Sequence, residues 1–310
     1  MKLAFVVDPL DHLKAYKDSS IAMMREAARR GHEIHAFEAR DMIVRDGAVA
    51  ASVRRLEISA GGDAWYRAAE AVDRPLADFA QIFMRKDPPF DQEYYYATLL
   101  LERAQAAGAR VLNDPRALRD WNEKLAILRF PALAPPTLIA SDMGRVHDFI
   151  AAHGDVILKK LDDMGGTMIF RVAAADVNRN VIVEAITDLG RRTIMAQRFI
   201  PEIAKGDKRV LVIAGKPFPY CLARIPKAGE TRGNLAAGGR GVAQPISERD
   251  REIGESVGRE LVKAGIVFAG LDVIGDWLTE VNVTSPTCIV EIAEQTGHDA
   301  AFALMDAIGV

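Results

Sequence analysis

The sequence predicts an α/β protein in which an N-terminal domain with a parallel sheet precedes a part of α+β character. Three observations predict this fold class. In the first third of the chain, short apolar runs alternate with helical segments, which is the pattern of β-α-β units. A rigid, proline-rich connection at residues 130–136 then marks a domain boundary. Beyond it, strands occur in adjacent pairs joined by glycine turns, as in antiparallel hairpins.

The first third contains the elements of a parallel sheet with helices on both faces. Its strands are short and apolar because both faces of such a sheet are buried. The first helix is capped by Asp18 and stops at Gly31, the second stops at Gly108, and a third begins at Asp114-Pro115. The predicted strands are residues 3–7, 33–37, 81–84 and 110–112, and the first two helices span residues 18–30 and 92–107.

The remaining two thirds contain paired strands. A glycine turn separates the strands predicted at residues 155–160 and 168–172, and a further strand is predicted at residues 137–140. One hairpin joins residues 209–213 to 220–225, and a second joins 267–274 to 277–283 across Gly275-Asp276.

The composition excludes several classes of protein. The chain has 310 residues, enough for two or three α/β modules, and its net charge of -3 offers no field for nucleic acid or an anionic membrane. No apolar run is long enough for a signal peptide or a membrane span. Cys221 and Cys288 lie far apart without metal-ligand spacing, so we expect reduced thiols that pack. We expect a cytoplasmic protein without nucleic-acid or membrane partners.

A glycine-rich segment at residues 226–241 differs from its surroundings. It has few large apolar side chains and therefore cannot bury itself. Long irregular loops within compact domains are usually lids or binding loops. The sequence predicts a mobile, functional loop here.

Two lysines and a glycine turn form the first candidate site, at residues 158–167. Lys159 ends a strand, and Gly165-Gly166 would let backbone N–H groups approach phosphate oxygens. The alternative is a plain hairpin turn. The segment is neither a Walker A motif nor a GxGxxG motif.

Carboxylates on the second hairpin form another candidate site. Glu280 and Asn282 lie two residues apart on one strand and therefore share a face, on which Asp272 of the other strand converges. Two carboxylates and an amide oxygen suit Mg²⁺. The alternative is an exposed polar face of an edge hairpin. The neighbouring residues are mostly apolar, which favours the metal site because clustered carboxylates are costly without a cation.

Arginines separated in the sequence form a third set. Arginine binds carboxylates and phosphates through two parallel hydrogen bonds. Each one taken alone is more often a solvated surface charge. Their positions at strand ends or within the glycine-rich loop favour a ligand-binding role for Arg85, Arg209, Arg224, Arg232 and Arg240.

With these residues in view, the sequence resembles the bacterial glutathione synthetases of the ATP-grasp type. The resemblance covers essentially the whole chain, and the lid motif and the motif that begins at Arg85 separate it from D-alanine–D-alanine ligases. The motifs that carry it are Lys17-Asp18-Ser19-Ser20, Met84-Arg85-Lys86-Asp87-Pro88-Pro89-Phe90-Asp91, Asn122-Glu123-Lys124, Gly206-Asp207-Lys208-Arg209-Val210, Tyr220-Cys221-Leu222-Ala223-Arg224-Ile225-Pro226, Gly229-Glu230-Thr231-Arg232-Gly233-Asn234 and Glu280-Val281-Asn282-Val283-Thr284-Ser285-Pro286-Thr287.

The resemblance implies an N-terminal α/β domain followed by a two-lobed ATP-grasp fold. The implied parts are residues 1–121, a small central lobe at 122–200, and a C-terminal lobe at 201–310 with a lid loop at 225–241. ATP would bind between the two lobes, with its adenine along the strand at residues 193–200.

The resemblance also implies roles for individual residues. The nucleotide would contact Lys124, Lys159, Met164, Gly165, Gly166 and Gln197. Mg²⁺, or Mn²⁺ in its place, would be held by Asp272, Glu280 and Asn282, in agreement with the reading of the hairpin above. The peptide substrate would contact Arg85, Arg209, Arg224, Asn282 and Ser285, and the catalytic residues would be Arg209, Arg224 and Arg232.

One departure from the family pattern lies in the phosphate loop, the predicted phosphate-binding turn at residues 158–167. The family usually has proline and glycine where this chain has Lys160 and Asp163. Asp163 brings a negative charge toward the expected triphosphate, where repulsion at ~4 Å could reach a few kcal/mol unless Lys160 or Mg²⁺ offsets it.

The implied activity is ligation of γ-glutamylcysteine and glycine to glutathione, with release of ADP and phosphate through an acyl-phosphate intermediate. Two alternatives remain open: an ATP-grasp ligase with a different peptide or amine acceptor, and an ATP-binding regulatory protein without turnover. The implied partners are the two small-molecule substrates and further copies of the chain, with a tetramer suggested by the family.

Overall fold

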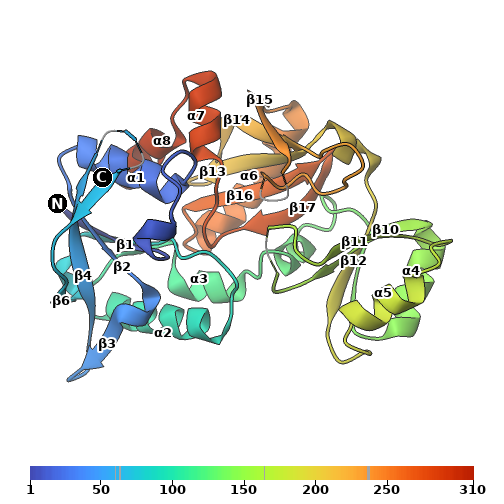
Figure 1. The fold of residues 1–310 in the computed structure, drawn as a ribbon, viewed down its shortest axis with the longest axis horizontal. Coiled ribbons are helices and arrows are strands. Elements are labelled where there is room, and N and C mark those ends of the chain that lie inside the picture. The colour runs from blue at the N-terminus through green and yellow to red at the C-terminus, as the bar shows by residue number, and fades with distance from the viewer. Residues whose placement is uncertain (60, 63, 164, 236–237) are drawn as a thin grey trace.

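In the part of the chain that the structure describes, three β-sheets and the helices that cover them make up the fold. A computed structural model describes residues 1–59, 61–62, 64–163, 165–235 and 238–310. The N-terminal part and the central lobe lie at opposite ends of the molecule, and the C-terminal lobe lies between them (Figure 1). The mixed α/β class predicted from the sequence is confirmed.

Four parallel strands form the centre of the N-terminal sheet. β1 (Lys2–Val6) pairs with β2 (Glu33–Phe37) on one side and β7 (Gln81–Met84) on the other. β7 in turn pairs with β8 (Val111–Leu112). All four lie within a residue of their predicted positions, and their side chains are almost all buried, as expected for strands covered on both faces.

An antiparallel extension makes this sheet mixed, which corrects the prediction of a parallel sheet. β4 pairs antiparallel with β2 and with the three short strands. The additional strands are β3 (Met42–Arg45), β4 (Ala48–Ile58), β5 (Tyr66–Ala68) and β6 (Val72–Pro75).

The sequence does carry a signal for this extension. Asp46 and Gly47 between β3 and β4 have φ values of 52° and 79°, the left-handed conformation of a two-residue hairpin turn. Val49, Ala51 and Val53 then alternate as buried residues along β4. An Asp-Gly pair before a run of alternating buried and exposed residues is a sequence signal for a β-hairpin.

Helices cover both faces of the sheet. α1 (Ser19–Arg29) is capped by Asp18, whose Oδ1 accepts from the backbone N of Ser20 at 2.7 Å. α2 (Gln92–Ala106) covers the opposite face, and α3 (Pro115–Asp120) is capped by Asp114 with proline in its first turn. The three predicted helices are confirmed.

The central lobe is an antiparallel four-stranded sheet with its own core. The strand order is β11-β10-β12-β9. Val146, Leu158 and Ile186 belong to a hydrophobic cluster that contains residues of this lobe alone. The elements are β9 (Thr137–Ala140), α4 (Met143–His153), β10 (Asp155–Lys160), β11 (Ile169–Ala173), α5 (Arg179–Ile186) and β12 (Ile194–Arg198).

The C-terminal lobe is a five-stranded antiparallel sheet in the order β15-β14-β13-β16-β17. Both predicted hairpins are confirmed, and Gly215 and Gly275 at their turns have φ values of 80° and 56°. The elements are β13 (Asp207–Ile213), β14 (Lys216–Ile225), β15 (Arg240–Pro245), α6 (Glu248–Lys263), β16 (Phe268–Ile274) and β17 (Trp277–Asn282).

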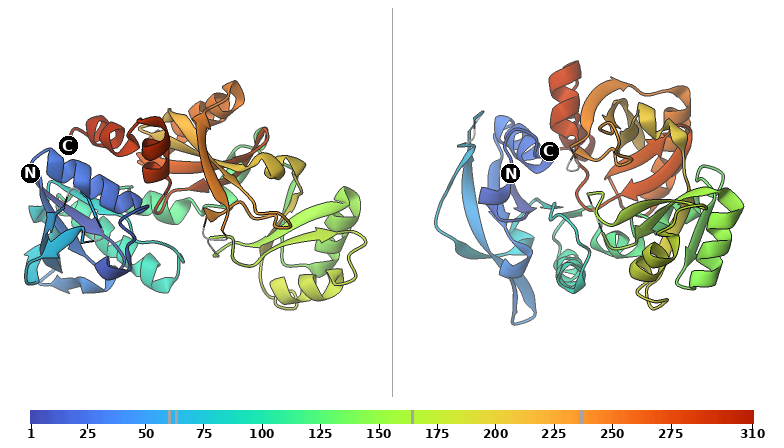
Figure 2. Two further views of the ribbon diagram at one scale, coloured as in Figure 1. Left: turned by 45° about the horizontal axis from the view of Figure 1, so that its top comes forward. Right: turned by 45° about the vertical axis from the view of Figure 1, so that its right-hand side comes forward.

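The last two helices return to the N-terminal part. α8 (Ala300–Ile308) packs beside α1, and α7 (Ile289–Thr296) lies between them and the C-terminal sheet (Figure 2). Arg30 forms an ion pair with Asp306 at 2.7 Å. The N-terminal and C-terminal parts therefore share hydrophobic cores, whereas the central lobe has a separate one.

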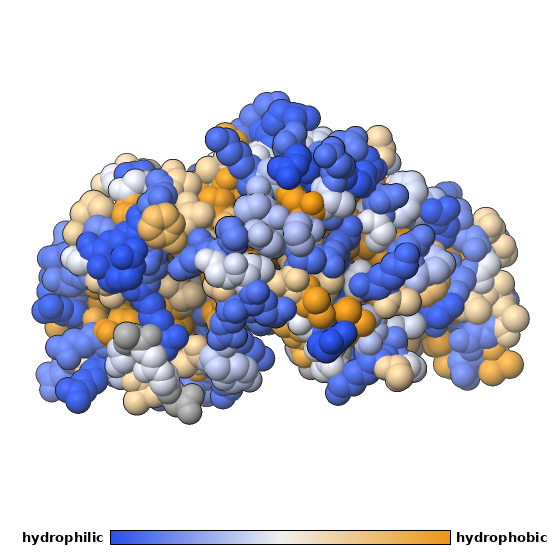
Figure 3. Space-filling model, turned by 90° about the horizontal axis from the view of Figure 1, so that it is seen from above, coloured by the Kyte–Doolittle hydropathy of each residue, from blue (hydrophilic) through white to orange (hydrophobic). Residues whose placement is uncertain are grey.

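The outside of the molecule is polar on the face shown in Figure 3, where charged side chains surround scattered hydrophobic ones. No helix among the described residues has the length and apolar character that a membrane crossing requires. Short 3₁₀ helices complete the structure at Leu10–His12, Ala39–Asp41, Leu76–Asp78, Leu125–Arg129 and Pro201–Lys205.

Candidate active site

A cavity of about 590 Å³ lies where the three parts of the chain meet. Its volume is within the range of sites that hold small molecules and cofactors. The N-terminal part contributes Lys17 and Asp87, the central lobe contributes Lys159 and Gln197, and the C-terminal lobe contributes the largest share. Among the described residues, each one assigned above to ATP, metal or substrate lines this cavity except Arg85 and the exposed Arg240.

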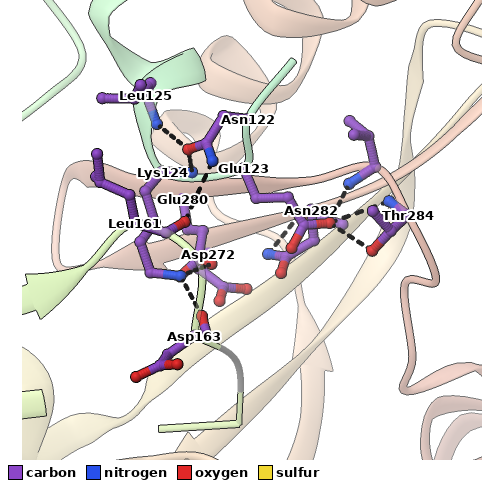
Figure 4. Close-up of polar contacts among 12 residues, drawn as sticks. Asn122, Glu123, Lys124, Leu125, Leu161, Asp163, Asp272, Glu280, Asn282 and Thr284 are labelled. Atoms are coloured by element: carbon purple, nitrogen blue, oxygen red, sulfur yellow. Dashed lines mark hydrogen bonds and ion pairs between the residues drawn. The ribbon is translucent and has the colours of Figure 1, made fainter. Parts of the chain in front are cut away.

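The segment Asn122-Glu123-Lys124 ties the parts together at the cavity wall (Figure 4). Asn122 donates through Nδ2 to the carbonyl of Leu161 at 3.2 Å. The half-buried Glu123 carboxylate accepts from the backbone N and the hydroxyl of Thr284, at 3.0 and 2.7 Å. Burial and the nearby Glu280 raise the pKa of Glu123. These contacts fix the backbone that carries Lys124.

Lys124 and Lys159 supply positive charge at one end of the cavity. The Nζ of Lys124 donates to the backbone carbonyl of Asp163 at 2.5 Å and lies 3.4 Å from Oε1 of Glu280 (Figure 4). Burial lowers the pKa of Lys159, the carboxylate of Glu280 opposes this shift, and the neighbouring Lys124 lowers the pKa further. A bound anion is the partner that would favour the charged form of Lys159.

The phosphate loop between β10 and β11 has a backbone that requires glycine. Gly165 and Gly166 have φ values of 65° and 84°, a conformation that costs other residues free energy. The Nζ of Lys160 lies 3.7 Å from Oδ2 of Asp163, so the two residues that depart from the family pattern form an ion pair. Met164 lies outside the described residues.

The predicted metal ligands come from adjacent positions of the second hairpin. Asp272 on β16 lies opposite Glu280 on β17, and Asn282 lies opposite Gly270. Asn282 donates through Nδ2 to the carbonyl of Gly270 at 3.1 Å, which leaves its amide oxygen as an acceptor. Two carboxylates and an amide oxygen in one cavity wall fit a hard divalent cation.

Two arginines and two carboxylates form a buried network beside these residues. Arg209 donates through Nε to Oδ1 of Asp272 at 2.6 Å. The Nη2 of Arg224 lies 2.9 Å from Oδ2 of Asp272 and 2.5 Å from Oδ2 of Asp207. Burial alone would raise the pKa of Asp272, but the two arginines hold it at about 2. Burial raises the pKa of Asp207 to about 6, against the opposing effect of Arg224.

The glycine-rich loop covers the cavity. Arg232 donates through Nη1 to the carbonyl of Gly166 at 3.3 Å and is held by Glu230, whose Oε2 accepts at 2.6 Å. The lid therefore touches the phosphate loop. Residues 236 and 237 of the predicted lid lie outside the described residues.

Apolar side chains line part of the cavity wall, including Ile157, which lies opposite Gln197 in the sheet. The buried Gln197 on β12 donates to the hydroxyl of Thr137 at 3.3 Å. An apolar wall beside a polar amide can bury a flat heterocycle, and the amide can form hydrogen bonds with the edge of its ring. The wall consists of Ile157, Ile169, Phe199, Ile200, Ile203 and Ile274.

Arg85 and Ser285 occupy positions that the sequence does not reveal. Arg85 is 5% exposed, does not line the cavity, and donates to the hydroxyl of Ser20 and the carbonyl of Pro286 at 3.0 and 2.9 Å. Ser285 lines the cavity and donates its hydroxyl to the carboxylate of Asp87. Arg85 thus supports the backbone next to Ser285 from behind.

Several carboxylates that line the cavity were not predicted as site residues from the sequence, and Asp207 and Glu291 are among them. Asp207 lines the cavity at the start of β13, and Glu291 lines it from the first turn of α7. Asp207 lies within a motif that carries the family resemblance, which is the only sequence signal for it. Glu291 lies in an ordinary amphipathic helix, so no sequence signal distinguishes it.

Comparison with known families agrees with this geometry. The model of the prokaryotic glutathione synthetase N-terminal domain matches residues 1–119, and the model of the prokaryotic glutathione synthetase ATP-grasp domain matches residues 123–297. The chain belongs to the prokaryotic glutathione synthetase family. The resemblance inferred from the motifs is confirmed.

Curated relatives match along the full length. The chain is 55% identical over 318 residues to the glutathione synthetase of Bordetella pertussis, and all of both chains is covered. It is 54% identical over 311 residues to that of Nitrosomonas europaea, covering 99% of this chain and 97% of the relative. For Salmonella typhimurium the identity is 50% over 308 residues, covering 99% and 98%.

Solved structures with low identity share the fold. The D-cycloserine synthetase DcsG superposes with a TM-score of 0.69 at 14% identity, covering 99% of this chain and 98% of that one. The ATP-grasp ligase PsnB, complexed with a minimal precursor, has a TM-score of 0.63 at 20% identity, covering 99% and 97%. The predicted ATP-grasp fold is confirmed, and with the family match the chain is an ATP-dependent ligase of glutathione biosynthesis.

Proposed function

We propose that the chain joins the free cysteinyl carboxylate of γ-glutamylcysteine to the amino group of glycine at the expense of ATP. One observation carries the proposal: two buried lysines, a carboxylate–amide set and a buried arginine pair converge in one cavity beneath a glycine-rich lid. The full-length similarity to glutathione synthetases supports the same products. The two lobes that enclose the cavity support domain boundaries near residues 121 and 200.

The first step makes the carboxylate reactive. A carboxylate oxygen of γ-glutamylcysteine attacks the γ-phosphorus of ATP, which gives an acyl-phosphate and ADP. Such a transfer depends on positioning and on neutralising the phosphoryl oxygens. Lys124 and Lys159 would hold the phosphates, the backbone at Gly165 and Gly166 would contact their oxygens, and Gln197 would meet the adenine.

A divalent cation fits the carboxylate end of the cavity. Asp272, Glu280 and Asn282 would hold Mg²⁺ or Mn²⁺, since each keeps an oxygen lone pair beyond the contacts described above. Such a cation, when bound, withdraws charge from phosphate oxygens. The ion pairs of Asp272 with Arg209 and Arg224 keep this carboxylate ionised and fixed in place.

The second step forms the peptide bond. The amino group of glycine attacks the acyl carbon, phosphate leaves, and the nitrogen loses its surplus protons to yield the amide. Arg209 and Arg224 would bind the peptide carboxylate and then the oxyanion that develops on it. Asn282 and Ser285 would contact the peptide from the same wall, whereas Arg85 would act only through the backbone it supports.

Exclusion of water is the task of the lid. An acyl-phosphate exposed to water is hydrolysed, so the loop must close before the intermediate forms. Arg232 would link the closed lid to the phosphate loop through its bond to Gly166. The assembly into a tetramer and the cytoplasmic location remain predictions, the latter supported by the two free cysteines.

The test is ADP release with ATP, Mg²⁺, γ-glutamylcysteine and glycine, with each component omitted in turn. We expect ADP only when all four are present, in equal amount to the glutathione formed. ADP that forms without either substrate would contradict the coupled reaction. ADP formation with a different amine but not with glycine would support the second candidate, a ligase with another acceptor.

A matched pair of lysine variants tests the assignment of the cavity. Lys159→Met replaces a buried ammonium in the cavity wall by an apolar group of similar length, and we expect the KM for ATP to rise at least tenfold. Lys205→Met, at an exposed lysine outside the cavity, should leave the KM unchanged. Equal KM values for ATP in Lys159→Met and Lys205→Met would show that the triphosphate lies elsewhere.

A further inference from the structure

Asp207 has a buried carboxylate oxygen without a partner. The residue is 8% exposed, and its Oδ2 accepts from Nη2 of Arg224 at 2.5 Å. Its Oδ1 receives no hydrogen bond from the described residues. Leaving a charged, buried acceptor unpaired is costly, so such an atom usually has a partner that the free protein lacks.

The charges around Asp207 narrow down what this partner can be. Arg224 is shared between Asp207 and Asp272, and Arg209 is engaged by Asp272. Lys159 is a further cation that acts on Asp207. None of these three cations donates to Oδ1. The missing partner is therefore a hydrogen-bond donor, and a charged donor gives the strongest bond to a carboxylate.

The position of Asp207 beneath the lid favours a ligand that arrives before closure. A Cβ at Gly233 would lie 3.1 Å from the Cβ of Asp207 and 2.3 Å from the carbonyl oxygen of Arg224. The lid backbone is thus packed directly on these two residues. A ligand that reaches Oδ1 from the cavity is therefore bound beneath the lid backbone.

We propose that Asp207 binds the ammonium group of the incoming glycine through Oδ1. The proposal rests on the function proposed above, because it takes glycine as the second substrate. Glycine carries an ammonium group at neutral pH, and that group offers three donors to a carboxylate. Asp207 is then a substrate-binding residue for the acceptor.

The neighbouring arginine explains why an ammonium group at this position would be useful. Arg224 donates to Asp207 and is a proposed binding group for the acyl oxygen. The ammonium held at Oδ1 passes one proton to this carboxylate, and the amine that forms lies next to the carbonyl it must attack, as proximity catalysis requires.

The test compares two nucleophiles in Asp207→Asn. Hydroxylamine is largely uncharged at neutral pH and traps an acyl-phosphate as a hydroxamate without requiring an ammonium site. For Asp207→Asn we expect kcat/KM for glycine to fall about 10- to 100-fold, the loss typical of a charged hydrogen bond. We expect hydroxamate formation from γ-glutamylcysteine and ATP to stay within about threefold of the native rate, because uncharged hydroxylamine makes no charged hydrogen bond to Asp207 that could be lost.

Glu291→Gln is the matched control. Glu291 is another carboxylate of the same cavity whose Oε2 has no hydrogen-bond partner among the described residues. This variant should leave the ratio of glycine to hydroxylamine turnover unchanged, even if both rates fall. Asp207→Glu keeps the charge and should recover part of the glycine turnover.

Three outcomes would overturn the proposal. An equal loss with both nucleophiles in Asp207→Asn would assign the residue a structural role through Arg224. An unchanged KM for glycine would show that the ammonium binds elsewhere. If the ratio of glycine to hydroxylamine turnover changes as much in Glu291→Gln as in Asp207→Asn, the loss of any carboxylate from the cavity has this effect. A native chain that forms neither hydroxamate nor glutathione would instead refute the proposed function.

Discussion

Removing the charge of Asp163 should strengthen ATP binding, because the phosphate loop carries an acidic residue where the family usually has glycine. The Asp163→Asn substitution keeps the shape of the side chain and removes its negative charge. It also keeps the backbone carbonyl to which Lys124 donates at 2.5 Å. The variant therefore isolates the charge from the rest of the loop.

The structure sets the size of the effect. Asp163 and Lys160 are 28% and 18% exposed and lie 3.7 Å apart, so water screens them and each offsets the other. A unit charge at ~4 Å interacts by about 1 kcal/mol in water and about 4 kcal/mol near a protein surface. With Lys160 offsetting part of the repulsion, we expect a gain near the lower figure, about fivefold in affinity for ATP.

The assay is the KM for ATP from ADP release, together with the Kd of the nucleotide by calorimetry. Lys160→Gln is the companion variant, and by the same reasoning it should weaken ATP binding about fivefold. The double variant should have an affinity for ATP within about twofold of the native protein, since the partly exposed ion pair contributes little free energy by itself. If both single variants shift the affinity in the same direction, the loop acts through its conformation and the electrostatic argument is refuted.

Three further predictions follow from the buried network and the lid. Arg224→Met leaves two buried carboxylates without their shared cation and should lower the free energy of unfolding by about 3–5 kcal/mol in urea titrations, whereas a loss below ~1 kcal/mol would contradict the network. Because the pKa of Asp207 is raised from 3.8 to about 6, the native state binds more protons in that window and its free energy of unfolding falls as pH rises. Asp207→Asn should flatten this slope between pH 3.8 and 6, and an unchanged slope would exclude the shift. Gly233→Ala places a Cβ 2.3 Å from a backbone oxygen and should uncouple ADP release from glutathione formation, whereas Gly61→Ala, with open space around it, should not.

The sequence alone determined much of the fold. Parallel strands, capped helices and hairpins are recognisable because their signals are local: apolar runs, an Asp or Asp-Pro cap, and glycine at turns. The glycines at 165, 166 and 275 have the left-handed φ values that turns demand. The convergence of Asp272, Glu280 and Asn282 follows from the two-residue period and a single turn, which is why it could be predicted without tertiary contacts.

The tertiary structure decided which charges meet. Arg85 and Arg209 look alike in sequence as strand-end arginines, yet Arg209 lines the cavity while Arg85 is buried behind it. Asp207 gains its role from Arg224, a partner that only the folded chain brings near. The physical reason is that an ion pair depends on the packing of several elements, whereas a strand or a turn depends on its own residues. The sequence thus specified the elements and the family, and the packing of three sheets determined the chemistry of each side chain.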